Sequence, residues 1–226
     1  MMVIAAAMSA LIASRTLTGT TAEFAQLQQQ GSYALRVMGM QFRQAGSMDP
    51  LRDQGTGLHA FEGSYPAHAR SMALVHGTDG PGRGSDTVSL IARQAPALAD
   101  HLRDCLGNTV KAGADMDATF ALGPAAELTC TSQRRNAALI GNVADFQVGY
   151  RVRIAEGLQL MRADEVDAAR QWDAIEAIEI CLDLQGSERT PDAAASYTDC
   201  QGRDQALDQR IHLVFRNVFD LRTRGR

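Results

Sequence analysis

The sequence predicts an α+β fold, in which a long N-terminal helix precedes an antiparallel β-rich domain. Residues 1–46 are apolar at first and then helically periodic, with no breaker residue in between. Beyond residue 46, short segments alternate apolar and polar residues and are separated by glycine-rich turns. Helix first and strands afterwards is the element order of an α+β fold. We therefore divide the chain into a helical segment, 1–46, and a β-rich head domain, 47–226.

The helix is predicted from two adjoining segments. The opening "MMVIAAAMSALIA" has no charged residue and Ser9 as its one polar residue. From Thr16 onward, apolar residues recur at helical spacing on one stripe, which predicts packing on the head domain. The stripe consists, besides Gly31, of Phe24, Leu27, Leu35, Met38 and Phe42. A helix from Met1 to Ala45 would be about 68 Å long. Because that exceeds the diameter of the head, we expect Met1 to about Thr21 to protrude.

The head domain is predicted from segments with strand-like alternation. In the clearest segment, alternate residues form one apolar face: Phe146, Val148, Tyr150, Val152 and Ile154. The predicted strands are 71–77, 86–92, 117–123, 126–132, 145–154, 174–184 and one or two within 210–222. The sequence of residues 162–172 predicts a short helix or turn.

Composition and motifs exclude several functional classes. Hydrophobic residues make up 45% and charged residues 21% of the chain, as in globular proteins. A net charge of −4 gives no electrostatic basis for nucleic-acid binding. His59, His68, His76 and Asp79 lie in one loop-rich segment, but their spacing matches no metal-ligand pattern. Since no nucleophile or acid–base motif is present either, we expect no catalysis, no metal and no cofactor.

The four cysteines do not form a zinc motif, because no CxxC pair or suitably spaced histidine accompanies them. Their even number fits an oxidising compartment, and four reduced thiols in a cytosolic protein is the alternative. If they form disulfides, three pairings are open, and each bridge would stabilise the fold by about 3 kcal/mol.

The apolar opening does not match a complete targeting segment. Thirteen residues are too few to span a bilayer, which requires about 20. No positively charged region precedes them, as it would in a signal peptide. We interpret the segment as the end of a longer membrane helix whose first turns precede Met1.

Six segments, in this order, resemble the PilW-like minor pilins of type IV pili, relatives of the J-class minor pseudopilins of type II secretion. They cover nearly the whole chain: "AQLQQQGSYALRVMGMQFRQAG", "GSDTVSL", "DCLGN" followed by "AELTC", "LIGNVADFQVGY", "QWDAIEAIEICLDL" and "VFRNVFDLRTR". Each motif is weak alone, and their shared order makes the resemblance specific. It implies a pilin-like fold, in which the N-terminal helix packs on an antiparallel sheet domain.

The resemblance also implies a role for the opening segment. In type IV pilins this region anchors the subunit in the membrane before assembly and packs in a helical bundle afterwards. The implied assembly positions are Val3, Ile4, Met8, Leu11 and Ile12. The family's leader, cleavage site and early glutamate have no counterpart in this sequence, which fits the interpretation that the upstream part is missing.

The resemblance implies a non-catalytic subunit of the complex that initiates a type IV pilus, and it implies a position at the tip of the fibre. Expected partners are other minor pilins, the major pilin and the inner membrane, with no small-molecule substrate. The head would be periplasmic and later at the cell surface, where two disulfides would form among Cys105, Cys130, Cys181 and Cys200. One alternative is a secretion pseudopilin. Another is a tip adhesin or DNA-uptake component, which the arginines near the C-terminus would favour: Arg216, Arg222, Arg224 and Arg226. An anchored periplasmic hydrolase has no supporting motif.

Overall fold

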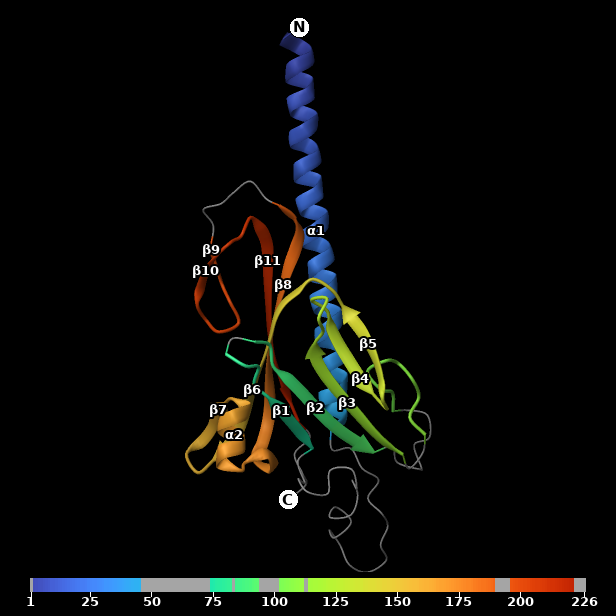
Figure 1. Ribbon diagram of the computed structural model, residues 1–226, viewed down its shortest axis with the longest axis vertical. Helices are drawn as coiled ribbons and strands as arrows, with labels where there is room; N and C mark the ends of the chain where they lie inside the picture. Colours follow the sequence, from blue (N-terminus) through green and yellow to red (C-terminus); the bar gives the residue numbers. More distant parts are fainter. Residues whose placement is uncertain are drawn as a thin grey trace, which may run out of the picture.

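The computed structural model describes residues 2–45, 74–82, 84–93, 102–111, 114–189 and 196–221, with the side chains of the N-terminal helix described from residue 19 onward. Figure 1 shows one long helix, α1, and two larger antiparallel sheets, of five and four strands. The α+β prediction is therefore confirmed. The predicted boundary at residue 46 lies outside the described residues.

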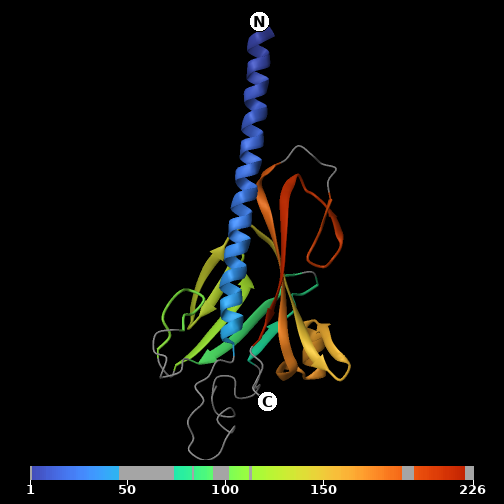
Figure 2. The same cartoon turned by 180° about the vertical axis from the view of Figure 1, so that it is seen from behind.

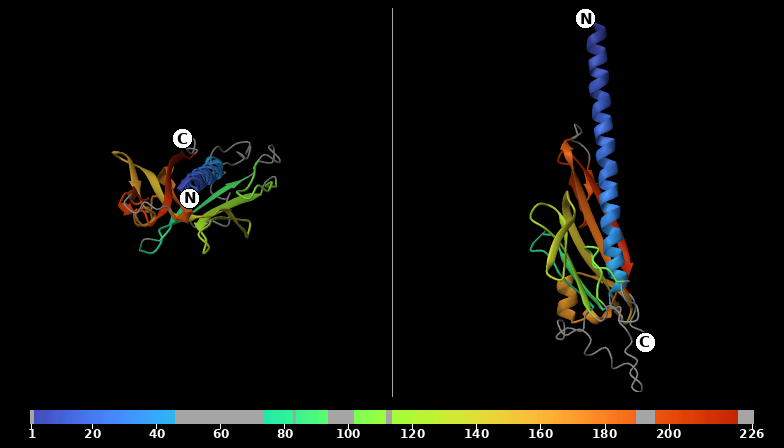
Figure 3. Two further views of the ribbon diagram at one scale, coloured as in Figure 1. Left: turned by 90° about the horizontal axis from the view of Figure 1, so that it is seen from above. Right: turned by 90° about the vertical axis from the view of Figure 1, so that its right-hand side faces the viewer.

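Helix α1 spans Met2–Gln44. Its sequence is rich in Ala, Gln, Leu, Met and Arg, which are strong helix formers, and Arg43 in the last turn complements the helix dipole. The second half of α1 lies in front of both sheets where they meet (Figure 2). The first half extends past the sheets (Figure 3).

The first sheet has five strands in chain order, each antiparallel to the next. They are β1 (Val75–Thr78), β2 (Thr87–Arg93), β3 (Asp115–Leu122), β4 (Leu128–Ser132) and β5 (Arg135–Ile140). Strands β2, β3 and β4 match predicted segments. Strand β5 was not predicted, because its first four residues are all exposed and show no alternation. Positive φ angles at Gln133 and Arg134 close the β4–β5 hairpin.

The second sheet has four strands in the order β11-β8-β6-β7. They are β6 (Val143–Ile154), β7 (Gly157–Met161), β8 (Ile175–Arg189) and β11 (Arg210–Asp220). The predicted face of β6 is buried at its Phe146, Val148, Tyr150 and Val152 positions. The predicted closing segment forms one strand, β11, and β7 was not predicted.

Three smaller elements complete the described fold. Helix α2 (Ala163–Ala169) and the 3-10 turn η4 (Trp172–Ala174) connect β7 to β8. Strands β9 (Ser196–Thr198) and β10 (Asp204–Ala206) form a separate hairpin. The short helix or turn expected within 162–172 is thus α2.

One apolar core joins α1 to both sheets. The ring of Phe42 in α1 lies 6.0 Å from the ring of Phe120 in β3 and 5.4 Å from that of Phe219 in β11. Leu27 and Met38 are also fully buried, and Leu35 is half-buried against the core. Burial of each such side chain stabilises the fold by roughly 1.5–3 kcal/mol.

The prediction that Phe24 packs on the head is wrong, because its side chain is 43% exposed. The buried stripe continues from Leu27 to Glu23, four residues earlier, and Glu23 is 9% exposed. Phe24, the next residue, lies about 100° from Glu23 around the helix axis and therefore points away from the head. Glu23 faces the head at this position because the backbone N–H groups at the end of β8 require a hydrogen-bond acceptor, which a phenylalanine side chain cannot supply.

Candidate assembly helix and its attachment to the head

The candidate functional element is α1, because part of it extends beyond the head domain (Figure 1). A Cβ atom added at Gly19 would meet no atom within 4 Å. The predicted assembly positions Val3, Ile4, Met8, Leu11 and Ile12 fall in the backbone of α1, but their side chains lie outside the described part.

Glu23 attaches the helix to the end of β8. Its Oε1 accepts hydrogen bonds from the backbone N–H of Ser187 at 2.5 Å, the Ser187 hydroxyl at 2.9 Å and the backbone N–H of Glu188 at 2.9 Å. A Cβ at Gly186 would lie 2.7 Å from Oε2 of Glu23, so the missing side chain permits this approach. The attachment joins residues 164 positions apart.

The carboxyl of Glu23 is held in its charged form. Burial acts to raise its pKa, but hydrogen bonds from Glu188 and Ser187 and the nearby Arg210 charge outweigh burial and lower the pKa. Hydrogen bonds to a charged acceptor are stronger than neutral ones. The apolar stripe predicted from the sequence does not include Glu23. One feature of the sequence could have identified Glu23: it lies four residues before Leu27, so that a charged residue continues the apolar face of the helix.

Two glycines let α1 approach β11 closely. A Cβ at Gly39 would lie 2.5 Å from Cε1 of Phe219, and one at Gly31 would overlap the ring of Phe215. Both rings point from β11 toward the helix. At the end of α1, the Gln41 amide donates to the backbone oxygen of Arg103 at 3.1 Å. Polar contacts at both ends and apolar contacts between them fix the position of the helix on the head.

Two disulfides constrain the head, Cys105–Cys130 and Cys181–Cys200. The first connects the loop at 102–111 to β4, and the second connects β8 to the turn of the β9–β10 hairpin. These are two local bridges, with sequence separations of 25 and 19.

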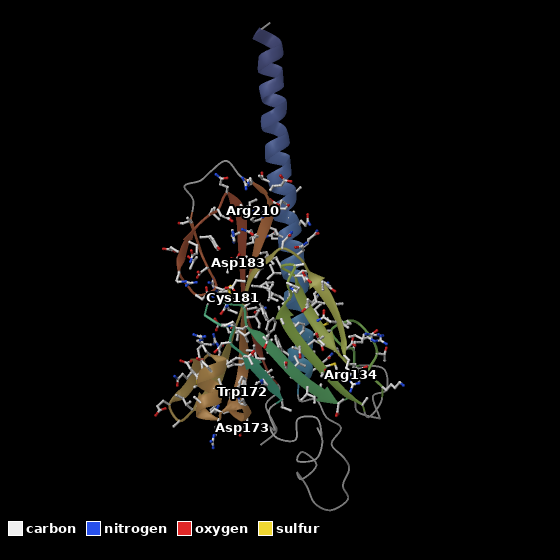
Figure 4. All side chains as sticks on the ribbon, viewed as in Figure 1. Arg134, Trp172, Asp173, Cys181, Asp183 and Arg210 are labelled. Atoms are coloured by element: carbon white, nitrogen blue, oxygen red, sulfur yellow. A yellow bond between two sulfur atoms is a disulfide. The ribbon has the colours of Figure 1, made fainter. Side chains whose placement is uncertain are left out.

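Polar contacts join the same hairpin to β11, and β11 to β8. Arg216 donates to the backbone oxygen of Asp199 at 2.5 Å, and His212 Nδ1 lies 3.0 Å from the buried Asp183. Figure 4 places Cys181 and Asp183 next to one another along this part of the sheet. Burial acts to raise the pKa of Asp199, but hydrogen bonds from Arg203 and Gln205 and the Arg203 charge lower it to about 2.

Two of the four residues considered as metal ligands, Asp79 and His76, have contacts within the described fold. Asp79 accepts hydrogen bonds from the backbone N–H groups of Ala163 and Asp164 at the start of α2. The ring of His76 lies 4.5 Å from that of Trp172. His59 and His68 lie outside the described residues. Within the described ranges, no three His, Cys, Asp or Glu side chains gather to hold a metal ion.

Among the described residues, no helix combines the length and apolar character needed to cross a bilayer.

No protein-family model matches this chain, and no curated protein does. Among solved structures, a type IV-like pilin from Thermus thermophilus is similar, with a TM-score of 0.50 and 14% sequence identity. The match covers 88% of this chain and 97% of that one. At this identity the similarity concerns the fold, and the chain has a pilin-like α+β fold: an N-terminal helix packed on antiparallel sheets.

Proposed function

We propose that this protein is a minor pilin, a non-catalytic structural subunit of the complex that initiates a type IV pilus. The observation that carries the proposal is the division of α1 into a half packed on the head and a half that extends past it. The pilin-like fold supports it, as does the resemblance of six segments to the PilW-like minor pilins.

In this proposal the extended half of α1 is the assembly element. Its opening segment, "MMVIAAAMSALIA", carries no charge, so water does not favour its exposure. Before assembly the segment would lie in the inner membrane with its head in the periplasm. After assembly it would pack among the helices of other minor pilins and the major pilin at the cell surface. In both environments its apolar side chains leave water.

The rigid attachment of α1 to the head supports the same role. Glu23, Gly39 and Gln41 hold the helix at three points along the head. A force or displacement applied to the helix is therefore transmitted to the head, as a subunit of a filament requires. An enzyme domain would not need the apolar N-terminal extension of this helix.

Co-purification tests this function. The protein is expressed from its own locus with a C-terminal tag, and the envelope is solubilised in detergent. We expect other pilin-like chains, identified by mass spectrometry, to co-purify with the full chain and to be lost when residues 2–21 are deleted. An unchanged thermal unfolding midpoint of the deletion variant would show that the head is intact.

Two results would contradict the proposal. Recovery of the full chain without any pilin-like partner would refute the assembly role. Equal recovery of partners with the deletion variant would show that the extended part of α1 is not the assembly element. The identity of the partners also separates a pilus subunit from a secretion pseudopilin.

A further inference from the structure

Strand β7 is an edge strand with exposed leucines. Among the described residues it has one neighbour in its sheet, β6, and it lies on the side of the head away from the five-stranded sheet (Figure 1). Leu158 is 50% exposed and Leu160 is 55% exposed. Natural proteins usually protect an edge strand with lysine, proline, a bulge or a covering element. The sequence of β7, Gly-Leu-Gln-Leu-Met, contains neither lysine nor proline, and its pairing with β6 shows no bulge.

The register directs unused backbone groups of β7 outward. Ile154 and Gly157 are the pair that closes the two-residue β6–β7 turn, and such a closing pair is hydrogen-bonded. Hydrogen-bonded and non-hydrogen-bonded pairs alternate along an antiparallel ladder. The N–H and C=O groups of Leu158 and Leu160 therefore point away from β6. Within the described part of the chain this edge is unpaired, and an unpaired edge is a template for another strand.

The two leucines share one face of the sheet with other exposed groups. Leu160 extends over Gly149 in β6, where an added Cβ would lie 2.8 Å from its Cδ1. Val218 in β11, which is 38% exposed, pairs with Glu179, and Glu179 pairs with Gly149. Leu160 also borders a groove of about 600 Å³. This face is mixed, because the ion pair of Arg151 with Glu179 lies between the leucines and Val218. A strand added to β7 would thus find its apolar contacts at the two leucines themselves.

We propose that β7 binds an extended strand of a neighbouring pilin-like subunit by edge-to-edge pairing. This inference rests on the proposed function. The strand would supply backbone groups for Leu158 and Leu160, and at least one apolar side chain on the face of the two leucines. Alternation along such a strand places its other side chains on the opposite face.

Geometry favours a neighbouring subunit of one assembly over a second free copy of this chain. A five-residue edge is about 17 Å long, too short to bury alone the roughly 1,200–2,000 Å² of a stable interface. The pairing must therefore add to another contact, which the bundled helices supply. Antiparallel pairing of two β7 strands would relate the copies by a twofold axis perpendicular to the sheet, so their α1 helices would point in opposite directions. Subunits in one membrane or filament need parallel helices.

Amide hydrogen exchange of the full chain in detergent tests the pairing. We compare the isolated chain with the chain in its co-purified assembly. We expect the amides of Leu158 and Leu160 to exchange at least about tenfold more slowly in the assembly. The backbone amide of Arg134, an exposed residue in the β4–β5 turn of the other sheet, serves as the reference, and its exchange should not change.

Substitution tests the leucine face. The double variant Leu158→Lys, Leu160→Lys should reduce recovery of the pilin-like partner about tenfold. Gln159→Lys is the matched control, because it adds a lysine to the same strand on the opposite face, and its recovery should equal that of the unaltered chain. Because all three side chains are exposed, thermal unfolding should be unchanged in each variant.

The outcomes separate the two proposals. If the partner co-purifies but the β7 amides are unprotected, or if the leucine variant recovers it normally, the edge pairing is refuted and the pilin function stands. If no pilin-like partner co-purifies with the unaltered chain, the proposed function fails and the edge pairing with it. A leucine-dependent dimer of the isolated chain would overturn the assignment of the partner.

Discussion

Replacing Gly39 with alanine should destabilise the protein, although alanine normally stabilises a helix. In an exposed helical position this change stabilises by about 1 kcal/mol. Here the new Cβ would lie 2.5 Å from Cε1 and 3.0 Å from Cδ1 of Phe219. Contacts this short do not persist, so the ring or the helix must move.

The room for that movement is small. Phe219 is 7% exposed, and its ring lies 5.4 Å from that of Phe42. Overpacking in a core costs about 1–3 kcal/mol. A 2.5 Å contact with a buried ring belongs to the upper part of that range, about 2–3 kcal/mol. After subtracting the helix-propensity gain of about 1 kcal/mol, Gly39→Ala should destabilise by about 1–2 kcal/mol. For a chain of this size, that lowers the unfolding midpoint by about 2–8 °C.

Thermal unfolding followed by circular dichroism measures the effect, with Gly19→Ala as the matched control. An added Cβ at Gly19 meets nothing, so this variant should not lower the midpoint. Gly31→Ala should have an intermediate effect, because the Phe215 ring that it meets is half-buried. In a Phe219→Leu background, the cost of Gly39→Ala should fall, since the ring is gone. If Gly39→Ala behaves like Gly19→Ala, close packing is not what requires glycine at that position.

Three further predictions concern polar and covalent attachments. Glu23→Gln should destabilise by about 1–2 kcal/mol and speed amide exchange at Ser187, and unchanged exchange there would show that the carboxylate does not hold the helix. The native pKa of Asp199, about 2, lies below its ordinary 3.8. Ionised Asp199 therefore contributes at most about 2 kcal/mol to the free energy of unfolding, fully above about pH 4 and progressively less as the pH falls through 2. Measuring the free energy of unfolding against pH checks this, and Asp199→Asn should flatten the acid part of that curve. Replacing Cys181 and Cys200 together by alanine should cost about 3 kcal/mol in denaturant unfolding. The control is to reduce both proteins, because the unaltered chain and the variant should then be equally stable.

Much of the secondary structure could be predicted because its signals are local. Helical spacing identified α1, and alternation identified β2, β3, β4, β6 and β8. Strands β5 and β7, each at a sheet edge, could not be predicted. The first four residues of β5 are all exposed and do not alternate, and β7 has five residues, which is too short for its alternation to be distinctive. An edge strand is stabilised largely by the neighbour with which it pairs, and that neighbour is not visible in the strand's own sequence.

The sequence by itself determined that the chain has a long helix, an apolar stripe along its second half and a β-rich head. Tertiary structure decided that the stripe ends at Glu23 and not at Phe24. It also decided that β8 lies between β11 and β6, and that Cys105 pairs with Cys130. Periodicity determines which residues share a face, because that depends on neighbours along the chain. What covers the face depends on groups that are distant in the sequence. The N–H groups from which Glu23 accepts hydrogen bonds, for example, lie more than 160 residues away.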